Sequence, residues 1–416
     1  MANADQRQDV AAFARAGWQA PEGQLSLANW QQGSWSRWSF QHIRQIIPTA
    51  LISRGSGAAW ELPSDPVSLR GISFRSRAGE MTLAAFLETS FTDGFIVLRD
   101  GAIVTERYDH GMRRDTRHLL LSVSKSMTGT LAGSVIGAGL LHHEALVTDY
   151  VPELAGTSFD GATVRQILDM SAGTRFSEDY TDPSSEIVQL QAIVGWLPQV
   201  PGMADLLSFI RTLPNERPHG QVFGYRSVLT DVLGLIIERA TGLPFAEAMS
   251  AYVWVPLGPE HDAEITVDPQ GDAVADGGMS ATLRDLARVG QLYLQEGCRD
   301  GYQVLPTWWV ADTGYADEQC RDAFAASADA PRLAICDPSA VECYASGHYR
   351  NQWWVPDPER GILLASGIYG QSLYIDSSAN IVGAKLSSKP QAFEAGRAAD
   401  TVRACAAVTA ALSEVS

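Results

Sequence analysis

A serine and a lysine three residues apart are the pair in this sequence best suited to chemistry. Ser122-Val-Ser-Lys125 places a hydroxyl and an amine on one face of a helix. At a helix N-terminus the serine oxygen lies near the positive end of the dipole, and its backbone N–H is free to face a substrate oxygen. An amine removed from water favours its charged form less, so an uncharged Lys125 could take the Ser122 proton. The spacing predicts acyl transfer by a Ser-Lys nucleophile.

The basic residues of the chain single out the same position. Of 31 basic residues only three are lysines, at positions 125, 385 and 389, and the rest are arginines. Arginine stays protonated at working pH, whereas a buried lysine can lose its proton. The sequence around Lys125 is apolar, with Val123, Met127, Leu131 and Val135. This pattern favours a buried lysine over one on a solvated helix face.

Two other segments could complete such a site. Tyr225, in Phe223-Gly-Tyr-Arg-Ser227, precedes an apolar helix, and a nearby cation would lower the pKa of its phenol toward a useful range. In Ser366-Gly-Ile-Tyr-Gly-Gln371 two glycines bracket a strand start, where backbone can approach a ligand and offer an N–H to an oxyanion. Taken alone, Tyr225 is equally compatible with a core position, and the second segment with an ordinary turn.

Strand patterns occur toward both ends of the chain. Residues 95–99 and 102–105 are rich in β-branched and apolar residues and flank Asp100-Gly101, which predicts a hairpin. Three short runs near the C-terminus predict an antiparallel meander. These runs are 361–366, 371–375 and 381–386.

Helical patterns dominate the middle of the chain. Residues 122–139 carry small residues spaced to let a helix pack closely in the interior, and apolar periodicity predicts further helices. The further helices are expected at 227–240, at 245–255, from the Thr282–Asp285 capping box to about 297, and at about 391–413. We therefore expect an α/β (α+β) fold with an antiparallel sheet domain from residues 1–160 and 281–416, and an inserted all-α domain at 161–280.

The composition of the chain limits the kinds of binding partner that we expect. The 416 residues carry a net charge of −17, which disfavours binding to nucleic acid and anionic membranes. We find neither a secretory signal nor an apolar run of the roughly 18 to 20 residues that span a bilayer, so we expect a cytoplasmic protein. Five cysteines without a C-x-x-C pair do not suggest a disulfide framework. A small-molecule substrate is the expected partner, and a homodimer is compatible with the sequence.

Nine short motifs resemble those of the serine β-lactamase/DD-peptidase superfamily, and within it those of the family VIII esterases and the nylon-oligomer hydrolases. The similarity extends from about Trp30 to Ser388. The motifs are Leu120-Leu-Ser-Val-Ser-Lys-Ser126, Tyr150-Val-Pro-Glu-Leu154, Ile167-Leu-Asp-Met170, Ser177-Glu-Asp-Tyr180, Tyr225-Arg-Ser227, Asp276-Gly-Gly278, Gln352-Trp-Trp354, Gly367-Ile-Tyr-Gly370 and Lys385-Leu-Ser-Ser388.

The resemblance implies the β-lactamase/penicillin-binding-protein fold, with the site in the cleft between its two domains. Ser122 would be the nucleophile, and Lys125 and Tyr225 would transfer protons. The N–H groups of Ser122 and Ile368 would form the oxyanion hole. Tyr180 and Trp196 would border the substrate. The implied activity is hydrolysis of small amides, such as 6-aminohexanoate-type linear oligomers, and of small carboxylic esters, without metal or organic cofactor.

The chain also departs from the superfamily pattern. Ile368-Tyr369-Gly370 stands where β-lactamases have Lys-Thr-Gly, so the cation that would hold a β-lactam carboxylate is missing, and Tyr369 is expected to change the pocket wall. Gln191 stands where some nylon-oligomer hydrolases have an acidic residue that meets the substrate ammonium. We expect Asp276 to supply that charge instead.

Other functions remain alternatives. The same fold could serve a carboxylesterase, a β-lactamase/DD-peptidase-like enzyme with another substrate, or a non-catalytic penicillin-binding-like module. An α/β-hydrolase is disfavoured because no G-x-S-x-G elbow occurs. A metalloenzyme is disfavoured because the eight histidines form no H-E-x-x-H motif.

Overall fold

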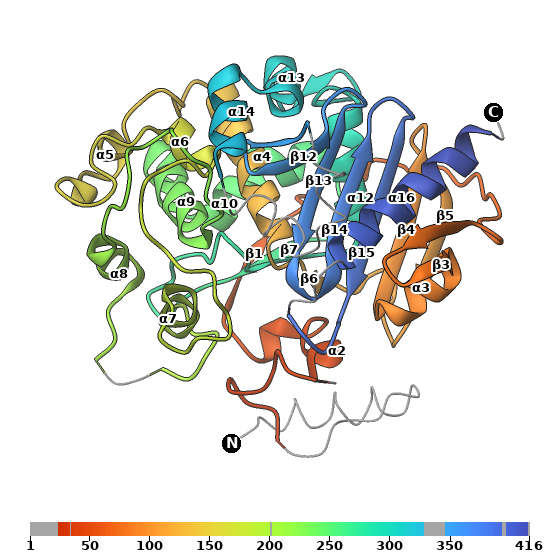
Figure 1. Cartoon of the computed structure of the whole chain (residues 1–416), viewed down its shortest axis with the longest axis horizontal. Helices are drawn as coiled ribbons and strands as arrows, with labels where there is room; N and C mark the ends of the chain where they lie inside the picture. Colours follow the sequence, from red (N-terminus) through yellow and green to blue (C-terminus); the bar gives the residue numbers. More distant parts are fainter. Residues whose placement is uncertain (1–23, 34, 200–201, 328–345, 393–396, 415–416) are drawn as a thin grey trace.

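A seven-stranded antiparallel sheet forms one side of the molecule (Figure 1). The computed structural model describes residues 24–33, 35–199, 202–327, 346–392 and 397–414. The strand order is β11-β12-β13-β14-β15-β4-β5, so β15 from the C-terminal part pairs with β4 from the N-terminal part. The strands are β4 (Thr92–Arg99), β5 (Ala102–Tyr108), β11 (His348–Arg350), β12 (Trp353–Asp357), β13 (Ile362–Gly367), β14 (Gln371–Asp376) and β15 (Ile381–Ser387).

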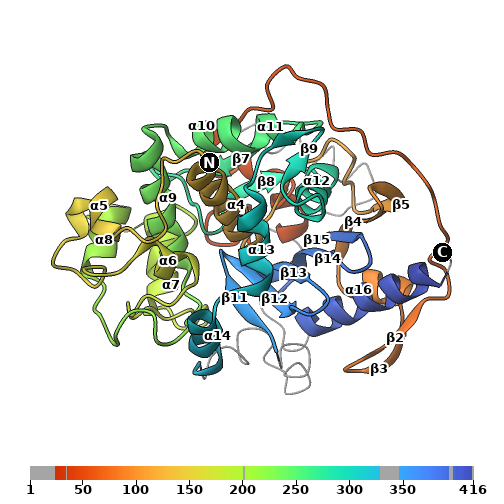
Figure 2. The same cartoon turned by 90° about the horizontal axis from the view of Figure 1, so that it is seen from above.

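Alternate residues of β4 enter two separate cores, because successive side chains of a strand point to opposite faces. Ile96 and Leu98 belong to the main core of the molecule, whereas Phe95 and Val97 belong to a smaller one. Helices α4 (Val123–Gly137) and α12 (Leu283–Leu294) pack on the first face, and α16 (Arg397–Ser413) covers the second (Figure 2). The sheet is therefore buried on both faces.

A second, smaller sheet brings two distant segments of the chain to the start of α4. Its strand order is β1-β7-β8-β6, formed by β1 (Thr49–Ile52), β7 (Ala263–Thr266), β8 (Met279–Ala281) and β6 (His118–Leu119). Strand β6 ends three residues before Ser122, and β8 begins three residues after Asp276. The sheet thus brings two segments that are distant in sequence to the start of α4.

Helices form the opposite side of the molecule (Figure 1). They are α5 (Val147–Tyr150), α6 (Val164–Leu168), α7 (Glu186–Ile193), α8 (Leu206–Thr212), α9 (Ser227–Thr241) and α10 (Phe245–Met249), with a π-helical turn at Ser250–Trp254 and α11 (Val255–Leu257). The remaining elements are α2 (Trp35–Ser39), η1 (Ile43–Gln45), β2 (Ser73–Ser76), β3 (Gly79–Thr82), α3 (Leu83–Thr89), η2 (Pro152–Leu154), β9 (Cys298–Arg299), β10 (Tyr302–Gln303), α13 (Thr307–Tyr315), α14 (Glu318–Ala325) and η5 (Ile368–Gly370).

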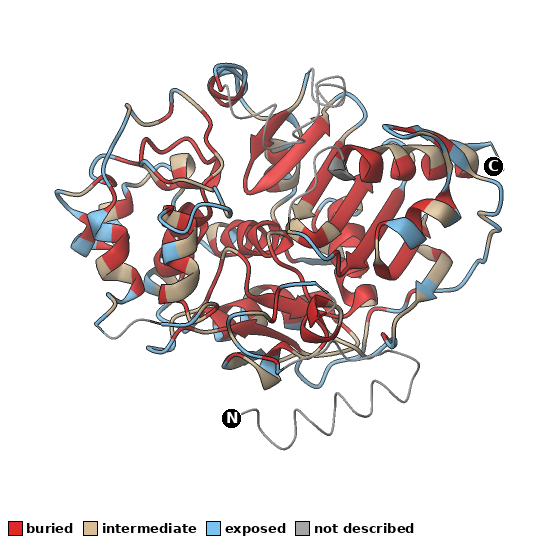
Figure 3. Cartoon of the chain, turned by 60° about the horizontal axis from the view of Figure 1, so that its bottom comes forward, coloured by how far each residue is buried: buried red, intermediate tan, exposed pale blue. Residues whose placement is uncertain are grey.

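Helix α4 runs between the two sides and is buried along nearly its whole length (Figure 3). Its small residues allow close packing, as the sequence predicted. A Cβ added to Gly129 would lie 2.2 Å from the backbone oxygen of Asn351, and one added to Gly133 would lie 2.4 Å from the Trp309 ring. Larger residues at these positions would push α4 away from its neighbours and shift Ser122.

The predicted elements agree well with this architecture. The 95–105 hairpin, the C-terminal meander and the helix at 122–139 are present, and the antiparallel sheet flanked by helices confirms the fold class. The expected helix at about 391–413 is present over Arg397–Ser413, and residues 393–396 lie outside the described range. None of the described helices combines the length and apolar content needed to cross a bilayer. The expected domain boundaries stay a prediction.

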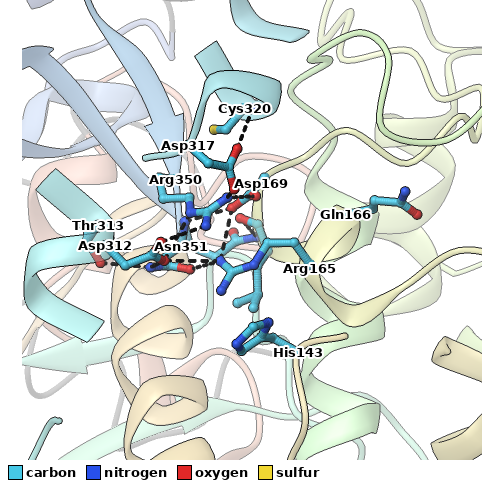
Figure 4. Close-up of polar contacts among 12 residues, drawn as sticks. His143, Arg165, Gln166, Asp169, Asp312, Thr313, Asp317, Cys320, Arg350 and Asn351 are labelled. Carbon is cyan, nitrogen blue, oxygen red and sulfur yellow. Dashed lines mark hydrogen bonds and ion pairs between the residues drawn. The ribbon is translucent and has the colours of Figure 1, made fainter. Parts of the chain in front are cut away.

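A buried network of charges joins the helical side to the β11–β12 hairpin (Figure 4). Asp169, at the end of α6, pairs with Arg350 of β11 at 2.8 Å and with Arg165 at 3.5 Å. Asp169 also accepts the N–H of Asn351 at 3.1 Å. Asp312 of α13 pairs with both arginines. The network fixes the hairpin that continues into Trp354.

We expect Asp169→Ala to lower the free energy of unfolding by about 3 kcal/mol, because it leaves two buried arginines short of one carboxylate. Asp312 still pairs with both arginines, so we expect a loss at the lower end of the range that is usual for breaking a buried ion pair. Urea unfolding measures the change. Asp115→Ala, in an exposed pair with Arg113, is the control and should change stability by less than about 0.5 kcal/mol. Equal losses in both variants would contradict this assignment.

Candidate active site

Ser122 and Lys125 face each other at the start of α4. The Lys125 Nζ lies 3.2 Å from the Ser122 Oγ, and the lysine side chain is 1% exposed. Ser122 is the N-cap residue of the helix, as the spacing predicted. The serine oxygen therefore lies in the positive field of the helix N-terminus, one turn from a buried amine.

The backbone before Ser122 makes a sharp turn. Leu121 has a φ of +48°, a left-handed conformation that is uncommon for a residue with a side chain. The end of β13 lies directly against this turn, since a Cβ added to Gly367 would be 3.0 Å from the Leu120 oxygen and 3.2 Å from the Ser122 nitrogen. A glycine at 367 thus lets the end of β13 lie against the Ser122 N–H, and Ile368 follows this glycine directly.

The segment around Asp276 surrounds the amine on another side. Lys125 Nζ donates to the Asp276 backbone oxygen at 2.9 Å and contacts its carboxylate at 3.4 Å. Helix α4 holds this segment in turn, because Thr128 donates to the Ala275 oxygen at 2.9 Å and Ser124 accepts the Met279 N–H at 3.1 Å. The same helix therefore positions both the lysine and the carboxylate that it contacts.

The charge of Lys125 differs from the sequence-based expectation. Burial alone lowers the pKa of Lys125, but the acidic groups that surround it, Tyr225, Asp276 and Glu178, raise it more, so the net shift is upward. The expectation of an uncharged amine in the resting protein was wrong. Its physical reason is that desolvation was considered without the acidic groups that distant segments bring to the same place.

Tyr225 completes the group around Ser122. The Ser122 side chain is close enough to the Tyr225 hydroxyl to lower its pKa, and Lys125 Nζ lies 5.3 Å from the centre of the Tyr225 ring. Trp354 stacks on the ring with centroids 5.5 Å apart, and Tyr349 meets its edge at 6.0 Å. Burial raises the pKa of Tyr225, although Lys125 opposes this shift, so the phenol is neutral near pH 7.

Sequence reasoning missed two acidic residues here. Glu178 accepts the Tyr180 hydroxyl at 3.2 Å and the Ser227 hydroxyl at 3.2 Å, which ties the Tyr180 loop to the start of α9. Asp231 is 1% exposed and accepts the Asp276 N–H at 3.1 Å. Burial and the neighbouring Asp276 raise the pKa of Asp231 well above its usual value, because both disfavour a negative charge at this position. An aspartate inside the apolar run of α9 was the available signal.

A small cavity that opens to solvent lies against Ser122. Ile368, Tyr180, Gln191, Trp196 and Asp276 line it, so the structure brings five of the predicted site residues to one cavity with Ser122. Aliphatic side chains form much of the remaining wall: Leu121, Ile187, Leu190, Val194 and Val274. The cavity suits a small, largely apolar ligand with a polar end.

Two aromatic residues of the predicted set have different environments. Trp196 lines the cavity while its ring N–H donates to the Thr266 hydroxyl at 3.1 Å, which fixes the indole. Tyr369 does not line the cavity; its ring is buried and meets Phe40 edge-on at 5.0 Å. The structure therefore gives Tyr369 a packing role behind the wall rather than a place in it.

The described residues offer no alternative centre of metal or disulfide chemistry. Within these ranges no group of three His, Cys, Asp or Glu side chains is arranged to hold a metal ion. Cys298, Cys320 and Cys405 are free thiols, and Cys336 and Cys343 lie outside the described residues.

Comparison with known proteins assigns the fold and the family. A family model described as "Beta-lactamase" matches residues 88–408, which is more than half of the chain. The chain belongs to the beta-lactamase family. Together with the Ser122 and Lys125 geometry, this membership makes the protein a serine hydrolase, and the predicted superfamily and enzyme class are confirmed.

Relatives within and near this family include amide and ester hydrolases. The chain is 39% identical over 372 residues to the 6-aminohexanoate-dimer hydrolase of Paenarthrobacter ureafaciens, covering 89% of this chain and 90% of that protein. It is 27% identical over 199 residues to the esterase EstB of Burkholderia gladioli, covering 43% and 48% of the two chains. A solved structure from Bacillus anthracis, provisionally assigned as a 6-aminohexanoate-dimer hydrolase, superposes with a TM-score of 0.84 at 26% identity, over 95% of this chain and 99% of that one.

We expect Asp231→Asn to stabilise the protein increasingly as pH rises. A carboxyl whose pKa is raised in the folded state keeps its proton while the unfolded chain loses it above about 3.8, so the wild-type contribution to stability falls as pH increases. Asparagine removes this dependence and still accepts the Asp276 N–H. Urea unfolding between pH 4 and 8 should show a growing difference, by at most about 1.4 kcal/mol per pH unit. A constant difference would mean that Asp231 ionises normally.

Proposed function

We propose that this protein hydrolyses short linear amides of the 6-aminohexanoate type, and small carboxylic esters, through an acyl-enzyme on Ser122. The main support is the buried Lys125 Nζ at 3.2 Å from the Ser122 Oγ, with Tyr225 close enough to both for its pKa to respond to them. The amide substrate class rests on the 39% identity to the 6-aminohexanoate-dimer hydrolase. No metal or organic cofactor enters the proposed reaction.

The reaction divides into two steps. The Ser122 oxygen attacks the carbonyl carbon, its proton passes to the Lys125 and Tyr225 pair, and the pair returns a proton to the leaving amine or alcohol. The N–H groups of Ser122 and Ile368, adjacent across Gly367, receive the negative charge on the carbonyl oxygen. Water then attacks the acyl group by the reverse proton path and releases the acid.

The resting charge of Lys125 has a consequence for this path. An ammonium cannot accept the Ser122 proton, so only the fraction of enzyme in which Lys125 has released a proton can react. A substrate ammonium that pairs with Asp276 would remove one carboxylate from Lys125, and a filled cavity would exclude water from it. Both effects lower the pKa of Lys125, so an amine-bearing substrate helps to produce the base that cleaves it.

Tyr180 is proposed to hydrogen-bond near the scissile amide. Its hydroxyl lies at the cavity and is held by Glu178. The aliphatic wall accommodates the methylene chain of an aminohexanoate unit, since such a chain offers no polar groups to satisfy.

An ester-selective enzyme is the second candidate. Gln191 lines the cavity as a neutral amide, which meets an ammonium less strongly than a carboxylate would, and one relative is an esterase.

We further propose a cytoplasmic location and a homodimer as the assembly to test by size-exclusion chromatography. A β-lactam is a poor candidate substrate, because Ile368-Tyr369-Gly370 provides no cation for its carboxylate.

We expect a fluorophosphonate probe to label the wild-type protein on Ser122 and to leave Ser122→Ala unlabelled, because Ser122 both lines the cavity and has a buried amine 3.2 Å from its hydroxyl. Intact-protein mass spectrometry measures the adduct. A correctly folded wild type that stays unlabelled would favour a non-catalytic binding module.

A substrate panel tests the proposed class. We expect turnover of p-nitrophenyl esters and of an aminohexanoate dimer, and little turnover of a chromogenic cephalosporin. Initial rates for the wild type, with Ser122→Ala as the blank, provide the measurement. Rapid cephalosporin hydrolysis without amide or ester activity would reject the proposal.

Asp276→Asn should separate the two roles of that carboxylate. For the amine-bearing dimer we expect KM to rise about tenfold, the usual loss for one charged hydrogen bond. For a neutral ester we expect an unchanged KM and a pH profile of kcat/KM that moves to lower pH, because Lys125 loses a neighbouring charge. An unchanged KM for the dimer would remove Asp276 from ammonium binding, and an unmoved ester profile would remove it from control of Lys125.

A further inference from the structure

All three lysines of the chain are buried, and two of them lie at the turn that follows Ile368. Lys385 is 2% exposed and Lys389 is 7% exposed. A buried ammonium is costly unless it is hydrogen-bonded, so these two positions need an explanation. The reaction outlined above uses neither of them.

The turn they contact is strained. Tyr369 has a φ of +62° and a ψ of 0°, within the left-handed region, and Gly370 follows with a φ of +101°. A tyrosine in this conformation persists only where its surroundings hold it, and such strain often occurs at functional sites. Here the Tyr369 N–H donates to the Ala392 oxygen at 2.9 Å, and its oxygen accepts the Lys389 N–H at 3.3 Å.

Lys385 holds the far end of the same turn. Its Nζ donates to the Gly370 oxygen at 3.1 Å and to the Ser387 hydroxyl, and lies 5.7 Å from the centre of the Phe86 ring. The strand that carries Lys385 is central in the sheet, paired with β14 at Ser372 and with β4 at Phe95. The Lys385 ammonium therefore extends from a central strand of the sheet and hydrogen-bonds to the strained turn at Tyr369 and Gly370.

We propose that Lys385 is a positioning residue for the oxyanion hole. Its ammonium fixes the Gly370 carbonyl, and with it the left-handed Tyr369 turn that directs the Ile368 N–H toward the substrate oxygen. This inference rests on the proposed acyl transfer at Ser122, to which it adds a residue that touches neither substrate nor nucleophile.

Physical reasoning favours an ammonium at this point. A charged donor binds a carbonyl more strongly than a neutral one and resists displacement when the Ile368 N–H is drawn toward a developing oxyanion. Lysine presents a compact charge with three donors, which suits a carbonyl and a hydroxyl as joint acceptors. The contribution would grow as charge develops on the substrate, so it should affect kcat more than KM.

Lys385→Met tests the proposal, because methionine keeps the length of the side chain and removes its charge and donors. We expect kcat for a p-nitrophenyl ester to fall about tenfold, less than the loss for a deleted direct oxyanion donor, with KM changed less than twofold. The affinity for a boronic acid, whose serine adduct places an oxygen in the oxyanion hole, should fall by the same factor as kcat. Thermal unfolding checks that the variant is folded.

Ser387→Ala is the matched control. It removes the hydroxyl that accepts from Lys385 and leaves the contact with the Gly370 carbonyl in place. We therefore expect kcat and boronic acid affinity to stay close to wild type. Lys385→Gln serves if the methionine variant does not fold, since its amide removes the positive charge but stays polar, and it should show the same selective loss of kcat.

The outcomes are distinct. An unchanged kcat in a folded Lys385→Met, a loss of kcat equal to that in Ser387→Ala, or a loss of boronic acid affinity unrelated to kcat would overturn the positioning role. A wild type that neither reacts with fluorophosphonate nor hydrolyses esters would instead reject the proposed function, before any Lys385 variant is examined.

Discussion

The arrangement of the candidate active site depends on the buried ammonium of Lys125 and on the groups that surround it. Lys125 contacts the Ser122 hydroxyl at 3.2 Å, the Asp276 backbone oxygen at 2.9 Å and the Asp276 carboxylate at 3.4 Å, with almost no exposure to water. A buried charge is tolerated only when its partners are fixed. The close packing of α4, the small sheet that presents Asp276 and the stacking of Tyr225 on Trp354 all supply that fixation.

The surroundings of Ser122 also place opposite charges on different elements. Acidic groups converge on Lys125 from the Tyr180 loop, from α9 and from the segment before β8. The proposed oxyanion side is formed by β13 and its strained turn, where the other two lysines are buried. Acceptor groups therefore surround the proton-transfer pair, and positive charge lies behind the proposed position of the substrate oxygen. Such a division is the electrostatic preorganisation that acyl transfer requires.

Much of this arrangement was predictable from local patterns. The Ser122 and Lys125 spacing, the Asp100-Gly101 hairpin and the C-terminal meander each depend on neighbours in sequence, and the structure has them where expected. The charge of Lys125 was not predictable, because it depends on carboxylates 53 to 151 residues away that only the tertiary fold assembles. The inward packing of Tyr369 on Phe40 escaped prediction for the same reason.

The protonation state of Lys125 in the resting protein can be measured directly, because the chain contains only three lysines. Protein labelled with ¹³C and ¹⁵N in lysine should give three side-chain resonances, and the one lost in Lys125→Arg belongs to Lys125. The acidic surroundings require its chemical shifts to be those of an ammonium at pH 7. Chemical shifts of a neutral amine at that pH would contradict the electrostatic account of the site.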